Sequence, residues 1–188
     1  FTTPTEVAEF LVGIAQVESG QEVLDPASGL GNLSRQLAAR DTDVTAVELN
    51  TRVANFAAFL NYFLDFEIDI INTDFLTLYP EPEQQILTDE STFSNTSSIS
   101  ISIGDQFDHV VVDVPFGNLK SEDPNYREQL QEELITATGK FNTEDVFIEK
   151  ALRHLKESGT LTALIPQGVL YRDNAQTLRE LILEDYTL

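Results

Sequence analysis

The 188-residue sequence has no cysteine, methionine or tryptophan. Without cysteine, the chain cannot form a disulfide, a zinc–thiolate site or a cysteine nucleophile. No apolar run approaches the ~20 residues that a membrane-spanning helix needs, so we expect no membrane partner. Because the sequence starts at Phe1 and lacks methionine, we expect it to be a fragment of a longer protein. Its length and its 41% of apolar residues predict one globular domain over 1–188.

Basic residues are also scarce, with 11 lysines and arginines against 32 acidic residues and a formal net charge of −21. A field of this sign repels nucleic acid at ordinary ionic strength, which argues against DNA or RNA binding by this chain alone. Acid-rich surfaces also suit halophilic cytoplasms, where molar salt shortens the Debye length to ~3 Å. The alternative is an acidic protein from an ordinary cytoplasm. Since the acidic residues are spread along the chain, we favour a halophilic, cytoplasmic protein.

Apolar strand-like runs alternate with stretches of helical periodicity, which predicts an α/β fold with a doubly wound, mostly parallel sheet. Residues 80–106 are rich in Pro, Glu, Ser, Thr and Asn and predict a polar surface insertion, with a β-hairpin as one form. Residues 117–142 are interpreted as a polar loop. The predicted strands cover about 22–27, 44–49, 69–75, 109–115 and 160–165, and the predicted helices cover 4–19, 51–64, 143–157 and 173–184, with one more around Leu33 and Leu37.

A glycine turn follows the first predicted strand. Gly29 and Gly31 allow a backbone to approach a ligand closely, and the next helix turns its free N–H groups toward an anion. Ser34 stands where a nicotinamide-dinucleotide motif has its third glycine. Glu48 ends the second strand, a position from which an acid accepts both hydroxyls of a ribose. Together these features predict a nucleoside-containing ligand, and the alternative is an ordinary turn with a solvated glutamate.

Two more acidic residues end predicted strands, where ligands of doubly wound sheets bind. Asp74 can accept an exocyclic amino group while Phe75 covers a base, although a turn cap is the alternative. The tetrapeptide Asp113-Val114-Pro115-Phe116 combines a carboxylate, a backbone carbonyl and a ring, and Pro115 restricts Val114 to extended geometry. Such a group can accept both hydrogens of one amino group while the ring stacks on the base. The alternative is a strand exit capped by Asp113.

In this order, the motifs resemble those of the S-adenosylmethionine-dependent adenine-N6 DNA methyltransferases, especially the modification subunits of type I restriction-modification systems. The resemblance covers nearly the whole chain except 80–106. It implies a Rossmann-like class I methyltransferase fold with strand order 3-2-1-4-5. The last two of seven strands would follow Leu188 and leave an open edge for oligomerisation. The motifs are Thr3-Pro4, Asp25-Pro26-Ala27-Ser28-Gly29-Leu30-Gly31, Glu48, Asn72-Thr73-Asp74-Phe75, Asp113-Val114-Pro115-Phe116, Glu144–Glu149 and Ile165–Arg172.

The resemblance also implies roles for these residues. S-adenosylmethionine is the expected cofactor, no metal is expected, and the target is an adenine flipped from duplex DNA. A recognition domain or subunit outside this sequence would read the DNA sequence. The methionine end of the cofactor would be held by Thr3, Pro4, Asp25, Ala27, Gly29 and Gly31, its ribose by Glu48, its adenine by Leu49, Asp74 and Phe75, and the target base by Asp113, Val114, Pro115 and Phe116.

Some features leave alternatives open. Val114 replaces a proline of the family pattern, which puts the rigidity of the loop in question and is the one feature that favours a non-catalytic scaffold. A methyltransferase of the same fold acting on RNA or on a protein glutamine amide is a further alternative, and Ser34 disfavours a nicotinamide-dependent oxidoreductase. The lone histidines, His109 and His154, are interpreted as structural, and Tyr171-Arg172 as the solvated start of a helix.

Overall fold

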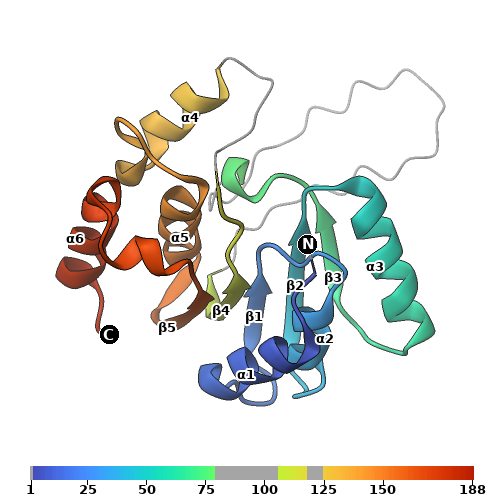
Figure 1. The fold of residues 1–188 in the computed structure, drawn as a ribbon. Coiled ribbons are helices and arrows are strands. Elements are labelled where there is room, and N and C mark those ends of the chain that lie inside the picture. Colours follow the sequence, from blue (N-terminus) through green and yellow to red (C-terminus); the bar gives the residue numbers. More distant parts are fainter. Residues whose placement is uncertain (1, 79–105, 118–124) are drawn as a thin grey trace, which may run out of the picture.

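The computed structural model describes residues 2–78, 106–117 and 125–188 (Figure 1). Five parallel strands form one sheet in the order β3-β2-β1-β4-β5, which confirms the predicted fold class and strand order. The predicted insertion at 80–106 lies outside the described residues, apart from Gln106. The strands are β1 (Glu22–Asp25), β2 (Asp43–Glu48), β3 (Asp69–Asn72), β4 (Phe107–Asp113) and β5 (Leu155–Leu164).

Both faces of the central strands are buried, as expected of a parallel sheet with helices on each side. On one face, Val23 and Val111 pack with α1 (Thr5–Ala15) and α2 (Asn32–Ala38). On the other face, Leu24 and Val110 belong to a second cluster that includes α5 (Thr143–Arg153). Consecutive residues of β1 and of β4 thus point to opposite faces of the sheet, as the two-residue period of a strand requires.

The remaining helices lie at the two ends of the sheet. The helix α3 (Thr51–Phe63) lies beside β2 and β3, while α4 (Tyr126–Glu133) and α6 (Gln176–Asp185) lie beyond α5 (Figure 1). The side chain of Asn50 begins α3 by accepting hydrogen bonds from the N–H groups of Arg52 and Val53. No helix within the described ranges has the length and apolarity required to span a bilayer.

Several predicted boundaries are wrong for local physical reasons. The first helix ends at Ala15 rather than at residue 19, because Gln16 has a left-handed conformation with φ of 52°. The third strand ends at Asn72, and Asp74 caps a 3₁₀ helix at Phe75–Thr77. The fifth strand begins at Leu155 instead of residue 160, with an irregular pairing opposite β4.

The region interpreted as a loop at 117–142 is not a loop throughout. It contains α4 and a 3₁₀ helix at Ile135–Ala137. The buried side chains of Tyr126, Leu130 and Leu134 recur every four residues and join the core beside α5. That spacing was available in the sequence, but the many polar residues between these positions concealed it.

Candidate functional site

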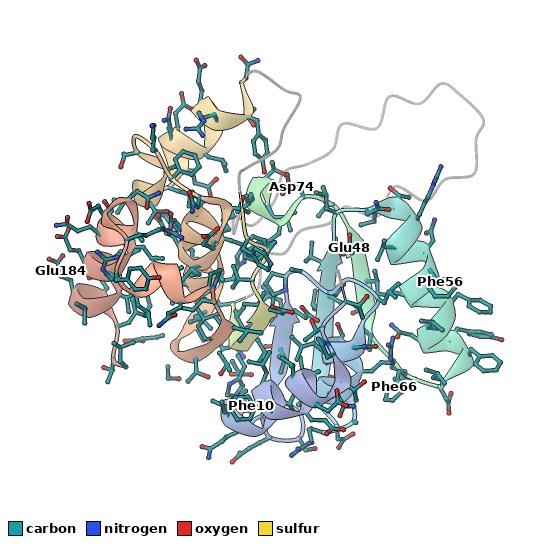
Figure 2. All side chains as sticks on the ribbon, viewed as in Figure 1. Phe10, Glu48, Phe56, Phe66, Asp74 and Glu184 are labelled. Carbon is teal, nitrogen blue, oxygen red and sulfur yellow. The ribbon has the colours of Figure 1, made fainter. Side chains whose placement is uncertain are left out.

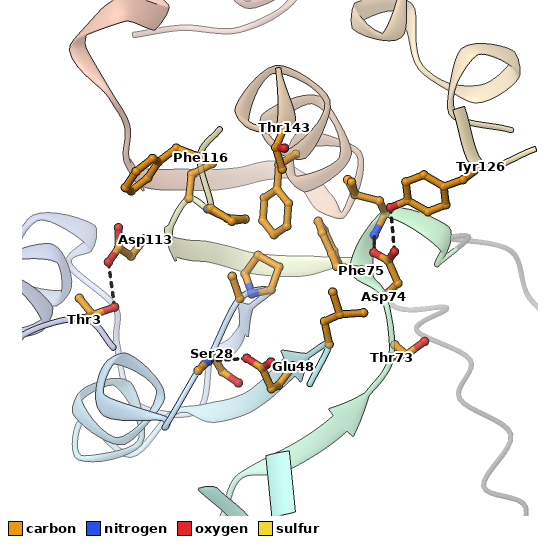
Figure 3. Close-up of a pocket in the computed structure, with 18 residues that line it drawn as sticks. Thr3, Ser28, Glu48, Thr73, Asp74, Phe75, Asp113, Phe116, Tyr126 and Thr143 are labelled. Carbon is orange, nitrogen blue, oxygen red and sulfur yellow. Dashed lines mark hydrogen bonds between the residues drawn. The ribbon is translucent and has the colours of Figure 1, made fainter. Parts of the chain in front are cut away.

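A cavity of about 450 Å³ opens at the carboxyl ends of β1, β2 and β4 (Figure 3). The structure brings most of the predicted site residues to it and adds seven others. The predicted residues in its lining are Thr3, Ala27, Gly29, Glu48, Leu49, Asp74, Phe75, Asp113, Val114, Pro115 and Phe116, and the additional ones are Pro26, Ser28, Thr73, Leu76, Tyr126, Thr143 and Phe147. Pro4, Asp25 and Gly31 do not line it.

Glu48 closes one side of the cavity by bridging the end of β2 and the glycine turn. Its Oε2 accepts a hydrogen bond of 3.0 Å from the N–H of Gly29, and its Oε1 accepts one of 2.6 Å from the N–H of Asn50. Gly29 and Gly31 have positive φ angles of 55° and 80°, which glycine adopts without strain. The predicted pairing of the glycine turn with the acid of the second strand is therefore present in the fold.

Asp25 lies behind this turn, with only 1% of its surface exposed. Its Oδ2 accepts a hydrogen bond of 2.6 Å from the hydroxyl of Ser34. Burial, helped by the nearby carboxylates of Asp113 and Glu48, raises the pKa of Asp25 to about 7, although the hydrogen bond from Ser34 opposes this shift. Asp25 is thus a buried carboxyl that supports the turn rather than a group on the cavity surface.

Asp74 faces the far side of the cavity, and both of its carboxylate oxygens have partners. Its Oδ1 accepts a hydrogen bond of 3.0 Å from the N–H of Leu76, and its Oδ2 accepts one of 2.7 Å from the hydroxyl of Tyr126 (Figure 3). Burial and the Asp74 carboxylate raise the pKa of Tyr126 above its usual value, so the phenol stays protonated and donates. Sequence reasoning missed Tyr126, because it placed this residue in a loop.

Aromatic rings form the floor of the cavity beside Asp74. The ring centroids of Phe75 and Phe147 are 4.9 Å apart, and His154 packs behind Phe75 at 5.2 Å. Phe147 was also missed as a site residue, although it belongs to the motif Glu144–Glu149. Neither ring nitrogen of His154 has a hydrogen-bond partner among the described residues. Burial and the charge of Lys150 lower the pKa of His154 to about 4, so this imidazole is neutral in the core.

The tetrapeptide that ends β4 forms the remaining wall. The hydroxyl of Thr3 donates a hydrogen bond of 3.0 Å to Oδ2 of Asp113, which joins the start of the chain to this strand (Figure 3). Val114 is buried, and its N–H donates a hydrogen bond of 3.1 Å to the carbonyl of Leu164 on β5. A proline at this position has no N–H and cannot make this bond. Phe116 is 61% exposed at the rim of the cavity.

Gly117 fixes the other end of this loop against α5. Its N–H donates to Oε2 of Glu144 at 3.2 Å, and its carbonyl accepts from the N–H of Thr143 at 3.1 Å. Glu144 in turn pairs with Arg172 at 2.5 Å, and Arg172 also pairs with Asp145. Burial opposes ionisation of Glu144, but these hydrogen bonds outweigh it and hold the pKa of Glu144 below its usual value. The loop is therefore held at both Val114 and Gly117.

These ion pairs correct the interpretation of Arg172 as the solvated start of a helix. Its side chain is only 18% exposed and is therefore not solvated, although Arg172 does precede a 3₁₀ helix at Asp173–Ala175, which α6 follows. His109 lies away from the cavity, with its ring nitrogens within hydrogen-bond distance of Thr160 and Gln21. Within the described parts of the chain, no cluster of three or more histidine, aspartate or glutamate side chains could hold a metal ion.

The chain is similar to a known protein family, to a type II methyltransferase and to solved structures. The family described as N-6 DNA Methylase matches residues 1–188. The type II methyltransferase M.TthHB8I of Thermus thermophilus is 27% identical over 191 residues, which cover 97% of this chain and 38% of that enzyme. The chain therefore spans well under half of this relative.

Two solved structures share the fold over 97% of this chain. One is assigned as a class I S-adenosylmethionine-dependent methyltransferase from Listeria monocytogenes, with a TM-score of 0.70, 19% identity and 52% of that chain covered. The other is assigned as a modification subunit of a type I restriction enzyme from Vibrio vulnificus, with a TM-score of 0.71, 18% identity and 38% of that chain covered. At these identities the likeness extends to the fold alone.

Proposed function

Because the chain belongs to the N-6 DNA methylase family, a family of S-adenosylmethionine-dependent methyltransferases, we propose that it is the catalytic region of an enzyme that methylates the N6 amino group of adenine in DNA. One observation carries the proposal. Glu48 and Asp113 are the last residues of β2 and β4, Asp74 lies two residues after β3, and all three line one cavity. Each can accept hydrogen bonds from a different part of a nucleoside cofactor or of its target base.

The cavity suits the cofactor in size and in the chemistry of its lining. Its volume of about 450 Å³ falls within the range of small-molecule sites. Glu48 would accept the ribose hydroxyls, and Asp74 would accept the adenine amino group beside Leu49 and Phe75. Ala27 and Gly29 would face the methionine end, where Thr3 also lies. Pro4, Asp25 and Gly31 do not line the cavity. We propose that they act by supporting residues that do, namely Thr3 and the glycine turn.

The second half of the site would bind the target base. Asp113 and the carbonyl of Val114 would accept the two N–H groups of the adenine amino group, and Phe116 would stack on the ring. Pro115 keeps Val114 extended, which fixes the direction of that carbonyl. Accepting both hydrogens favours a nitrogen whose lone pair points away from these two acceptors. S-adenosylmethionine supplies an electrophilic methyl group when it is bound, and positioning of the nitrogen provides much of the rate.

A base inside a duplex cannot reach this cavity, so the proposed reaction includes flipping of the adenine. The exposed ring of Phe116 would partly compensate the lost stacking. With a net charge of −21, the chain is unsuited to holding DNA by itself at ordinary salt. We therefore propose that another domain or subunit supplies sequence recognition.

Cofactor binding is tested by calorimetry with S-adenosylmethionine and with NAD. We expect the first to bind and the second not to bind. Replacing Glu48 with Ala should weaken binding by about 1.5–3 kcal/mol, the range for hydrogen bonds to a charged group. Glu9→Ala, an exposed position on α1, is the matched control. Unchanged affinity in Glu48→Ala would remove Glu48 from the site.

The substrate is tested in the whole protein that contains this chain. Labelled methyl transfer should be measured in parallel with DNA, RNA and protein as acceptors, and we expect label in DNA adenine. Asp113→Ala should abolish transfer while cofactor affinity stays close to that of the unmodified protein. Loss of cofactor binding in Asp113→Ala would show that Asp113 is structural, and label in RNA or protein would replace the proposed substrate.

A further inference from the structure

An exposed aromatic surface covers the outer side of α3, well away from the fold's buried core. Phe56, Phe59, Tyr62 and Phe63 are 51%, 59%, 87% and 74% exposed. Their rings form a row, since the centroids of Phe56 and Phe59 and those of Phe59 and Phe63 are each 6.4 Å apart. Figure 2 shows Phe56 pointing outward from this helix, on the side away from the sheet. We refer to these four side chains as the α3 aromatic surface.

The spacing of these residues is that of a helix-packing seam. Arg52, Phe56, Phe59 and Phe63 are separated by four, three and four residues, the repeat that places side chains along one line of a helix. The opposite side of α3 carries the buried residues Ala54, Ala57 and Asn61 and already packs on the domain. The helix thus has two packing faces, of which the described part of the chain covers one.

Charge is distributed around the surface in a way that favours a second α3 as its partner. The helix contains no acidic residue and a single basic residue, Arg52, in a chain with 32 carboxylates. Two exposed acidic residues, Asp65 and Glu67, follow its carboxyl end. If two copies pack with their α3 helices antiparallel about a two-fold axis near Phe59, Arg52 of each copy lies beside the acidic turn of the other.

The area of the surface is sufficient for a weak but specific dimer. If a fully exposed aromatic side chain offers about 200 Å², the four rings leave about 500 Å² exposed on each copy. An exposed area of about 500 Å² is comparable to that of the largest apolar patch on a typical monomer. Two copies together would bury about 1,000 Å². We propose that the α3 aromatic surface is a homodimer interface, in which two α3 helices pack antiparallel around Phe59 and Phe63.

The proposal goes beyond the proposed function and does not depend on it. It has a distinctive dependence on salt, because each copy carries a net charge of −21. At ~0.1 M salt the two copies repel one another, while at ~1 M the Debye length of ~3 Å removes most of this repulsion. The dimer should therefore become tighter as salt is added.

Sedimentation velocity of the 188-residue chain over a range of concentrations, at low and at molar salt, tests the proposal. We expect a monomer–dimer equilibrium that shifts toward the dimer in molar salt. The double variant Phe59→Ser with Phe63→Ser should weaken dimerisation by at least about 30-fold, as expected for the loss of central aromatic residues. The control is Phe10→Ser on α1, which removes a phenylalanine of similar exposure, 65%, outside the surface.

A charge exchange tests the antiparallel arrangement and does not depend on removing aromatic rings. Arg52→Glu should weaken the dimer at low salt, and adding Glu67→Arg to the same chain should restore it. Circular dichroism should show unchanged folding in every variant. A chain that is monomeric at all concentrations in both salts would overturn the proposal, as would a dimer that the double serine variant leaves intact. Failure of the charge exchange to restore the dimer would overturn the antiparallel packing.

Discussion

The hydroxyl of Tyr126 donates a hydrogen bond of 2.7 Å to Oδ2 of Asp74, which joins α4 to the end of β3 across 52 residues of sequence. The N–H of Leu76 holds the other oxygen of the same carboxylate. Asp74 is therefore fixed in orientation before any ligand arrives. Such preorganisation lowers the entropy that a ligand loses when it uses this carboxylate as an acceptor.

If Tyr126 orients Asp74, Tyr126→Phe should weaken binding of S-adenosylhomocysteine by about two- to tenfold, the equivalent of one ordinary hydrogen bond. The comparison uses an analogue of S-adenosylhomocysteine that carries oxygen in place of the adenine amino group. Because this analogue has no amino group to donate to Asp74, calorimetry should show the same affinity for Tyr126→Phe as for the unmodified chain. Tyr171→Phe, which alters an exposed tyrosine outside the cavity, is the control. Tighter binding to Tyr126→Phe would instead show that the phenol competes with the ligand for Asp74.

Much of the site could be predicted from the sequence because its residues lie at or just after the carboxyl ends of strands. A parallel sheet brings the carboxyl ends of its strands to one edge, so Glu48, Asp74 and Asp113 could be placed together without knowledge of their contacts. The strand order could be expected only from the family resemblance. Tyr126 and Phe147 could not be assigned to the site in this way, since both reach it from helices on the α5 side through tertiary packing.

The burial of Asp25 behind the turn also could not be predicted from the sequence. An acidic residue at the end of a strand is typical of a cofactor-binding turn, but its distance from the cavity depends on how the turn packs over it. Arg172 was misassigned for a similar reason, because its partners Glu144 and Asp145 lie 28 and 27 residues earlier in the chain. The halophilic origin inferred from the charge stays a prediction.

Val114 gives a prediction about the loop that would hold the target base. Val114→Pro should lower the free energy of unfolding by about 1 kcal/mol, because it removes the N–H that bonds to Leu164 and leaves that carbonyl without its partner. Urea denaturation measures the change. Equal or greater stability in Val114→Pro would show that the rigidity of proline outweighs the lost hydrogen bond, and that the loop of this chain gains nothing from valine.

Arg172 gives a prediction about the support of the same loop. Its guanidinium pairs with Glu144 and Asp145, which are 3% and 1% exposed. Arg172→Leu leaves two buried carboxylates without this partner, so we expect a loss of about 3–5 kcal/mol in the free energy of unfolding at pH 7. The loss should shrink as the pH falls and the carboxylates become protonated. Arg40→Leu, at an exposed position after α2, is the control and should have little effect.

Asp25 allows the pH dependence of stability to be assigned to one residue. Its pKa is about 7 in the folded chain and near 3.8 in the unfolded chain, so between these values the folded chain binds the proton more tightly. The stabilisation from this protonated carboxyl is fully present below pH ~4 and is lost as the pH rises through about 7. Ionisation of buried Asp25 should therefore cost the native chain several kcal/mol at pH 8, on the order of 4.

Asp25→Asn removes this titration and keeps an oxygen that can accept the hydrogen bond from Ser34. We expect the variant to gain stability relative to the unmodified chain as the pH rises from ~4 to ~8 and the difference to level off above that range. Denaturation at a series of pH values measures this difference, and contributions from other titrating groups cancel in it. Asp43→Asn, at the exposed start of β2, should show no such rise. A flat difference for Asp25→Asn would mean that Asp25 is already ionised in the folded chain well below pH 7, and that burial does not control its charge.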